Sequence, residues 1–213
     1  MVEAQHIAST MKIVDSKAEQ DVLESLLEGS KPPLPAGIED LDYLLATPFR
    51  YDPRRQGSRF RAVTDPGVYY GAESVRTAGA ELGYWRWRFL KDAVDLDRIE
   101  PVAHTAFSVD IDTTAIDLRR PPFDEGITVW KHPADYSGTQ AFACVGREAG
   151  IGAIVYESVR DPEAAWCLAL LQPSGFAMKR PHPEVQTWWL AVKPSEVIWR
   201  RDHESMTFSA TDW

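Results

Sequence analysis

Apolar residues recur at helical spacing in two segments of the first half of the chain. The first segment, residues 15–29, places four apolar side chains on one helical face: Val22, Leu23, Leu26 and Leu27. Ser16 and Glu19 have the spacing of an N-terminal capping box, and Gly29 can end the helix. Three prolines follow within residues 30–37, and they predict an extended connector because proline cannot continue a helix.

The second helical pattern follows a short strand. "GVYYGA", residues 67–72, lies between turn-forming residues, and its tyrosine doublet sends one ring to each face, so at least one ring is expected in the core. Residues 73–91 carry one apolar helical stripe: Val75, Ala78, Leu82, Trp85 and Phe89. Glu81 lies three residues after Ala78 and four before Trp85, so we expect its carboxylate to flank the buried face.

The remainder of the chain reads mostly as short strands with turn residues between them. The predicted strands are 103–111, 114–118, 127–130, 153–158, 166–171, 187–193 and 196–200, and one helix is predicted at 137–150. Helices early and strands later indicate the α+β class. The chain divides into an N-terminal helix with a proline-rich connector, residues 1–37, and one globular unit, residues 38–213.

Composition narrows the classes of function. With 213 residues, 44% hydrophobic and 26% charged, the chain can bury a full core, and no apolar run approaches the roughly 18 residues of a membrane span. The first twenty residues show no secretory pattern, and Cys144 and Cys167 are unclustered. We therefore expect a cytoplasmic protein with free thiols and without a metal site. A net charge of −9 opposes binding to nucleic acid but leaves a local phosphate pocket open.

Taken one at a time, the candidate polar residues have structural interpretations. On spacing alone, an ion pair with Arg59, Arg61 or Arg86 explains Glu81 better than a functional role, because charges near a core are normally paired. Ser158 follows a predicted strand, where a hydroxyl more often forms a turn than a site.

Order and spacing together carry more information. "TPFRY", "GSRF", "VYYGAESVRTAGAE" and "YESVRDP" follow one another in the chain, and together they resemble the signature segments of the RES-domain family. The resemblance runs from about residue 41 to about residue 200, and its most specific part is the interval of eleven positions from Tyr70 to Glu81. Two departures are visible: Ser58 separates Gly57 from Arg59, and Arg61 stands where the family often has asparagine.

The resemblance implies an ADP-ribosyltransferase-like fold, with mixed and antiparallel sheets surrounded by helices. It also implies that the chain is the toxin of a RES–Xre toxin–antitoxin pair. Toxins of this family deplete cellular NAD, so NAD would be the substrate, and no cofactor or metal would be needed. The implied partner is a helix-turn-helix antitoxin that makes the DNA contacts, and a homo-oligomer within that complex is compatible with this picture. Carried over by position, the implied catalytic residues are Glu81, Arg50 and Ser158, of which Arg50 corresponds to an arginine in the family's first strand. The implied NAD-binding residues are Arg59 and Tyr70, with Arg61 as a possible substitute for Arg59.

These residue types suit the implied chemistry. Cleavage between nicotinamide and ribose passes through an oxocarbenium-like state that a fixed carboxylate stabilises, which is the role implied for Glu81. Forked guanidinium groups bind a diphosphate bidentately, which is the role implied for Arg50 and Arg59. The Tyr70 ring offers a face to the nicotinamide, and Ser158 offers a neutral hydrogen bond near the leaving group. Water and inorganic phosphate both remain open as the acceptor.

Other functions fit the sequence less well. A serine hydrolase would need a histidine beside Ser158, and no histidine lies in a nucleophile-elbow context. A Rossmann dehydrogenase would need a glycine fingerprint that is missing. Transfer of ADP-ribose to a macromolecule stays open, although an E-x-E pair near the end of the chain is absent. A non-catalytic nucleotide-binding module also stays open, in which the eight tryptophans line an interface instead of a core.

Overall fold

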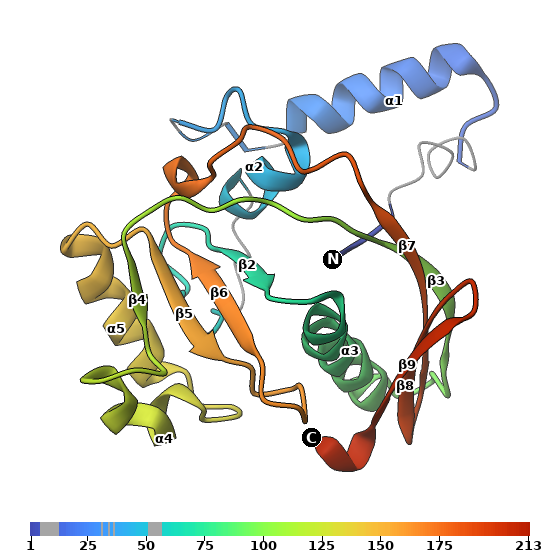
Figure 1. The fold of residues 1–213 in the computed structure, drawn as a ribbon. Coiled ribbons are helices and arrows are strands. Elements are labelled where there is room, and N and C mark those ends of the chain that lie inside the picture. The colour runs from blue at the N-terminus through green and yellow to red at the C-terminus, as the bar shows by residue number, and fades with distance from the viewer. Residues whose placement is uncertain (5–12, 31, 34, 36, 51–56) are drawn as a thin grey trace.

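The computed structural model describes residues 1–4, 13–30, 32–33, 35, 37–50 and 57–213, and it has the predicted α+β class (Figure 1). The described α-helices are α1 (Lys17–Ser30), α2 (Tyr43–Arg50), α3 (Val75–Asp92), α4 (Ile127–Trp130) and α5 (Ser137–Glu148). The strands are β1 (Val2–Glu3), β2 (Tyr69–Ala72), β3 (Ile99–Ala106), β4 (Ala115–Asp117), β5 (Ala153–Glu157), β6 (Trp166–Leu170), β7 (Gln186–Lys193), β8 (Glu196–Arg201) and β9 (Glu204–Ser209). Short 3-10 turns occur at η2 (Phe123–Gly126), η3 (Pro173–Gly175) and η4 (Ala210–Asp212).

The larger sheet is antiparallel and has the strand order β1-β3-β7-β8-β9. Alternate residues of β7 and β8 point into its core: Trp188, Leu190, Val192, Val197 and Trp199. Helix α3 packs across this face through Gly79 and Gly83. A Cβ on Gly83 would lie 2.9 Å from Val197 Cγ1, and the Trp199 indole donates to the Gly79 carbonyl at 3.1 Å. Glycine therefore sets how close the helix lies to the sheet.

The smaller sheet has the order β2-β6-β5-β4, with a parallel pairing only between β4 and β5. Its two faces carry separate apolar clusters. One cluster, which includes Ile154 and Ala169, packs together with Ala143 of α5, and the other, which includes Tyr69 and Leu170, packs together with Leu45 of α2. This arrangement leaves β2 beside the start of α3, where the predicted site residues begin.

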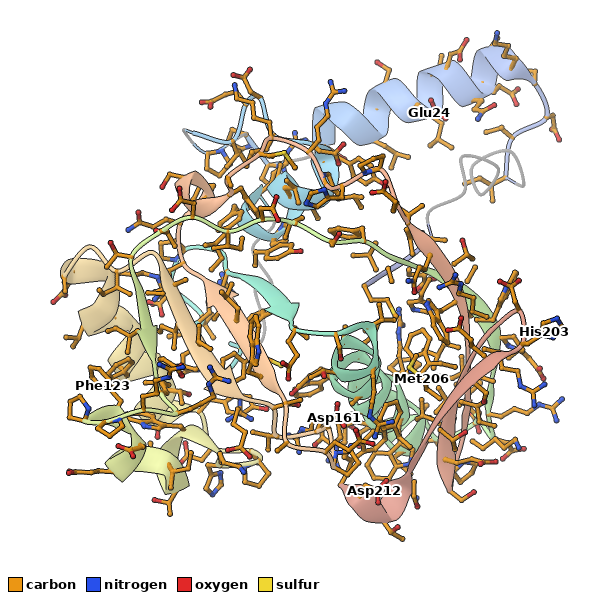
Figure 2. All side chains as sticks on the ribbon, in the orientation of Figure 1. Glu24, Phe123, Asp161, His203, Met206 and Asp212 are labelled. Carbon is orange, nitrogen blue, oxygen red and sulfur yellow. The ribbon has the colours of Figure 1, made fainter. Side chains whose placement is uncertain are left out.

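The N-terminal segment contains the predicted helix. The hydroxyl of Ser16 accepts a hydrogen bond from Glu19 N at 3.2 Å, as the capping spacing predicts, and α1 lies at the periphery of the molecule, where Glu24 is marked (Figure 2). Strand β1 nevertheless pairs with β3 of the larger sheet. Residues 31, 34 and 36 of the predicted connector lie outside the described residues, and the boundary at 37/38 stays a prediction.

Two strand predictions need correction, and the predicted strands do not include β9. Residues 127–130 form helix α4, which continues the turn η2, and the backbone is satisfied by a bond from Lys131 N to Ile127 O at 2.9 Å. A four-residue apolar run cannot by itself distinguish strand from helix. The strand predicted at 103–111 is β3, displaced towards the N-terminus, and the chain leaves that sheet after Ala106. Strand β9 was not expected, although Met206 and Phe208 show the alternation of a strand.

None of the described helices is long and apolar enough to cross a membrane.

Candidate active site

A pocket of about 820 Å³ is lined by parts of both sheets and by one side of α3. Strands β2 and β6, the turn at 57–59 and the segment that follows β3 contribute its walls. Its polar lining includes Ser58, Arg59, Tyr70, Glu81, Tyr136 and Arg160. Three of the six predicted site residues, Arg59, Tyr70 and Glu81, therefore meet in one place.

Glu81 projects into the pocket from α3, whose first turn is capped by Ser74, which accepts from Thr77 N at 3.1 Å. One carboxylate oxygen, Oε1, accepts from Ser158 Oγ at 2.7 Å and from Val159 N at 3.3 Å. The thiol of Cys167 lies 3.8 Å from the same oxygen. No described residue donates to Oε2. The carboxylate is therefore fixed through one oxygen while the other is available to a ligand.

The ion-pair interpretation of Glu81 is wrong for the described part of the chain. Arg86 pairs with Glu3, and Arg59 donates to backbone carbonyls. Neutral donors, a hydroxyl and a backbone N–H, stabilise this carboxylate in place of a cation. No described cation pairs with this carboxylate on the side that faces the pocket.

Ser158 follows β5 directly, as predicted, but the residue is buried and does not line the pocket. Its hydroxyl donates to Glu81 and accepts from Arg160 N at 3.3 Å and Asp161 N at 3.1 Å. Ser158 thus orients the carboxylate and shapes the loop after β5. No described histidine contacts its hydroxyl, so the structure offers no base for a serine nucleophile.

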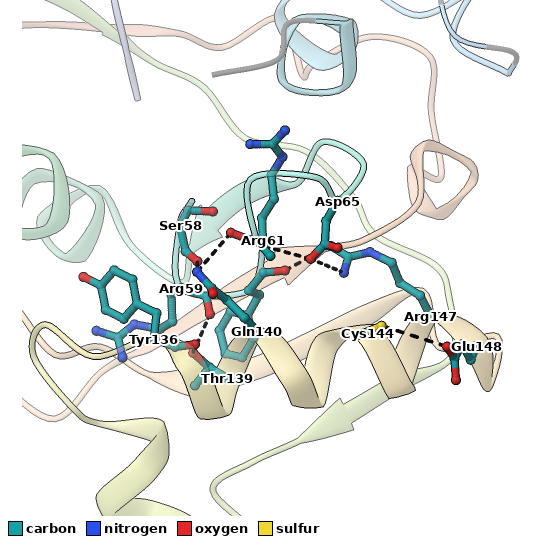
Figure 3. A network of polar contacts seen from close by, with 12 residues as sticks. Ser58, Arg59, Arg61, Asp65, Tyr136, Thr139, Gln140, Cys144, Arg147 and Glu148 are labelled. Atoms are coloured by element: carbon teal, nitrogen blue, oxygen red, sulfur yellow. Dashed lines mark hydrogen bonds and ion pairs between the residues drawn. The ribbon is translucent and has the colours of Figure 1, made fainter. Parts of the chain in front are cut away.

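The turn that carries Arg59 is held from two sides, and Figure 3 shows the side that faces α5. Ser58 and Arg61 bridge across it, and Gln140 of α5 donates to the carbonyls of both, at 3.0 and 3.2 Å. From the other side, the Tyr70 hydroxyl accepts from Phe60 N at 3.0 Å and lies 2.7 Å from Ser58 Oγ. The turn is therefore held by hydrogen bonds within the chain itself.

Arg59 and Arg61 leave this turn in different directions, as Figure 3 shows. Arg59 lines the pocket, donates from Nη1 to the carbonyls of Trp130 (2.8 Å) and His132 (3.0 Å), and lies 4.7 Å from the ring centre of Tyr136. Arg61 is buried and does not line the pocket. The geometry favours Arg59 over Arg61 as a ligand contact.

Tyr70 presents its ring to the pocket and is 37% exposed, whereas its hydroxyl is enclosed by the 58–60 turn. Burial of the hydroxyl raises the pKa of Tyr70, so the phenol stays protonated. Tyr69 points to the other side of the sheet and is buried, as the alternation of a strand predicts. The Tyr70 hydroxyl therefore stabilises the 58–60 turn, and its ring is accessible to a ligand in the pocket.

Arg50 does not lie in a strand, contrary to the expectation from the resemblance. It is the last residue of α2, which buried Leu45 and Ala46 hold against the body, and its Nε donates to the Pro32 carbonyl at 2.8 Å. It does not line the pocket.

Sequence reasoning did not assign several residues that line the pocket, among them Tyr136, Arg160 and Cys167. Arg160 lay within the "YESVRDP" segment, so a signal was present, whereas Tyr136 had none because it precedes a helix in an unremarkable loop. Burial raises the pKa of the Cys167 thiol, which keeps it neutral beside the carboxylate.

Comparison with known proteins adds one match. A family model described as RES domain matches residues 34–193, which include every predicted site residue and exclude α1, β8 and β9. No curated protein matches the chain.

Proposed function

The chain belongs to the RES-domain family, and on that premise we propose that it is an enzyme that cleaves NAD between nicotinamide and ribose. The observation that carries this proposal is the Glu81 carboxylate, fixed through Oε1 by Ser158 and Val159 and open at Oε2 towards the pocket. A fixed negative charge in a half-enclosed pocket is what an oxocarbenium-like state requires.

The reaction needs little from the protein beyond position and charge. The bond between ribose C1′ and the nicotinamide nitrogen breaks, its electron pair leaves with neutral nicotinamide, and positive charge develops on the ribose. Glu81 Oε2 stabilises that charge and binds a ribose hydroxyl. Water or inorganic phosphate then bonds to C1′, and when water adds, it releases a proton. The Tyr70 ring supplies a flat face for the nicotinamide.

We further propose that this activity makes the chain the toxin of a toxin–antitoxin pair, held inactive by a helix-turn-helix antitoxin encoded nearby and acting in the cytoplasm. Support comes from membership of the family, and from the net charge of −9, which leaves DNA contacts to the partner. Expression of the chain alone in a heterologous bacterium should arrest growth and lower cellular NAD, and Glu81→Gln should do neither. Normal growth with full-level, folded protein and unchanged NAD would refute the toxin assignment.

The enzyme assignment is tested by incubating purified protein with NAD and measuring released nicotinamide by chromatography. Glu81→Gln keeps the size of the side chain and removes its charge, so turnover should fall about 100-fold or more while NAD still binds. Glu125→Gln removes the same charge from an exposed turn outside the pocket and should cleave NAD at the normal rate. NADH should stay intact, because its ring is uncharged and a poor leaving group.

The outcomes separate the candidate functions. Intact NAD with folded, partner-free protein that still binds NAD would leave a non-catalytic nucleotide-binding module. Label from NAD that appears on a macromolecule, with little free ADP-ribose, would indicate transfer to that macromolecule.

A further inference from the structure

Arg160 lines the pocket, whereas Arg50, which the resemblance assigned to the site, does not. Arg160 follows Ser158 by two residues and is buried with 4% exposure. Its Nη2 donates to the carbonyl of Pro133, and Arg59 donates to the carbonyl of His132. Because these two carbonyls belong to consecutive residues, both guanidinium groups are anchored on the same short piece of backbone.

Neither of these arginines has an acidic partner among the described residues. Other arginines with buried or half-buried side chains in this chain do: Arg119 pairs with Asp117 at 2.8 Å and Arg147 with Asp65 at 3.5 Å. A buried cation is normally compensated by a carboxylate, because the loss of water around an unpaired charge is costly. Two buried cations without an acidic partner on one pocket wall indicate a site for an anion.

Both groups are also oriented by aromatic side chains of the chain itself. Arg160 lies 3.6 Å from the ring centre of Tyr84, and Arg59 lies 4.7 Å from that of Tyr136, so aromatic rings fix both guanidinium planes. No described residue accepts a hydrogen bond from Nε or Nη1 of Arg160, or from Nε or Nη2 of Arg59. Each arginine therefore retains N–H donors for a ligand oxygen, in the planar geometry that suits a phosphate.

We propose that Arg160 and Arg59 form a two-guanidinium clamp for the diphosphate group of the nucleotide. Two positive charges face the two negative charges of a diphosphate. Arg160 N also bonds to Ser158 Oγ, which holds Glu81, so the clamp is tied to the catalytic carboxylate through a single side chain. The clamp thereby fixes the distance from the diphosphate to the ribose bond. The identity of the ligand rests on the proposed function, whereas the preference for a diphosphate can be measured separately.

The test measures binding of adenosine, AMP and ADP by calorimetry, because none of them contains the bond that the enzyme cleaves. In the wild type, ADP should bind at least about tenfold more tightly than adenosine. In Arg160→Gln, affinity for ADP should fall about tenfold or more, on the scale of a charge-assisted hydrogen bond, while affinity for adenosine stays within about twofold. Arg88→Gln, which removes the same charge from an exposed pair with Asp92, should bind all three as the wild type does.

An unchanged affinity for ADP in Arg160→Gln would overturn the clamp, and so would an equal loss for adenosine, which would show that Arg160 only supports the fold. If Arg160→Gln does not fold by circular dichroism, Arg160→Lys keeps the charge but not the fork. It should bind ADP about threefold or more weakly than the wild type, and wild-type affinity in that variant would also overturn the clamp.

These outcomes do not depend on turnover. Loss of ADP affinity in Arg160→Gln together with a wild type that never cleaves NAD would retain the clamp and refute the enzyme. Cleavage of NAD by the wild type together with normal ADP affinity in Arg160→Gln would refute the clamp and retain the enzyme.

Discussion

Removal of one hydroxyl tests whether Ser158 acts through Glu81. Ser158 Oγ donates to Glu81 Oε1 at 2.7 Å, the shortest of the bonds that hold this carboxylate. A hydrogen bond to a charged group is worth about 1.5–3 kcal/mol, and each 1.36 kcal/mol corresponds to a tenfold change in rate. Ser158→Ala should therefore lower kcat for nicotinamide release by about 10- to 150-fold, with the affinity for NAD changed little.

The same substitution has a cost in stability that the assay has to separate from catalysis. Arg160 N and Asp161 N lose their acceptor, and both residues are buried. A buried donor without a partner costs about 1–3 kcal/mol, so urea denaturation should show a loss of that size. Turnover is then measured where circular dichroism shows that the variant is folded, with Ser205→Ala on the exposed side of β9 as the matched control.

A double-mutant cycle decides between positioning and an independent role. If Ser158 works through Glu81, adding Ser158→Ala to Glu81→Gln should cost far less than the product of the two single losses, because residues that act as a unit are non-additive. Multiplicative losses would refute the positioning role. So would Ser158→Ala with kcat within twofold of the wild type.

Three further predictions concern the scaffold. Tyr70→Phe removes the acceptor that holds the 58–61 turn, so the free energy of unfolding in urea should fall by about 1–3 kcal/mol. Gly83→Ala places a Cβ 2.9 Å from Val197 Cγ1 and should lower the same quantity by about 1–3 kcal/mol through overpacking. Burial lowers the pKa of His104 below its usual 6.5, so around that pH the unfolded chain binds more protons at this residue than the folded chain does. The free energy of unfolding should therefore be highest above pH 6.5 and should fall as the pH drops below that value. His104→Gln should lose this dependence when unfolding is measured from pH 5 to 8.

Each of these predictions has a matched control in the chain. Tyr43→Phe alters an exposed ring and should leave stability unchanged. Gly146→Ala in α5 meets no atom closer than 3.8 Å and should be neutral or stabilising, since alanine favours a helix. His203→Gln, at an exposed position, should keep the pH dependence of the wild type. A control that shifts as much as its partner would contradict the corresponding argument.

The strands of the larger sheet were largely predictable because one of its faces is buried and the residues alternate, whereas the strands of the smaller sheet read as short apolar runs because both of its faces are covered. β7 shows this most clearly, with Trp188, Leu190 and Val192 buried and the residues between them more exposed. The strand predicted at residues 127–130 was wrong, because a run of four apolar residues fits a strand and a buried helical turn equally well.

Helix α3 shows why the position of a helix could not be predicted from its apolar stripe. The residues buried against the larger sheet include Gly79, Ala80 and Gly83, which carry almost no hydrophobic signal. The stripe itself is only partly buried: Val75 and Leu82 pack at the margin of this core and also line the pocket. Trp85 is 49% exposed and Phe89 58%. Glu81 was expected beside the core, but it lines the pocket. The reason is that the face of α3 that carries Gly79 and Gly83 packs against the larger sheet, because these small residues allow a close approach.

The arginines could not be assigned by motif because burial and pairing are three-dimensional properties. Arg50, Arg59 and Arg160 all stand within segments that resemble the family, but of these three the resemblance assigned site roles only to Arg50 and Arg59. Only the fold brings two of them to one loop and turns the third towards the Pro32 carbonyl.

The proposed ligand is a dinucleotide with an oxidised nicotinamide ring, and its charges can be compared with those of the pocket. Oxidised NAD carries two negative charges on its diphosphate and one positive charge on its ring. The pocket offers groups of both signs: Arg59 and Arg160, which are anchored on neighbouring carbonyls, and the carboxylate of Glu81. Two more carboxylates, those of Glu73 and Glu184, also line it. A simple phosphate would leave Glu81 without a counterpart, and a cationic metabolite would meet the two arginines unfavourably. A chain with a net charge of −9 can therefore bind an anion, because the field that a ligand meets is that of the pocket wall.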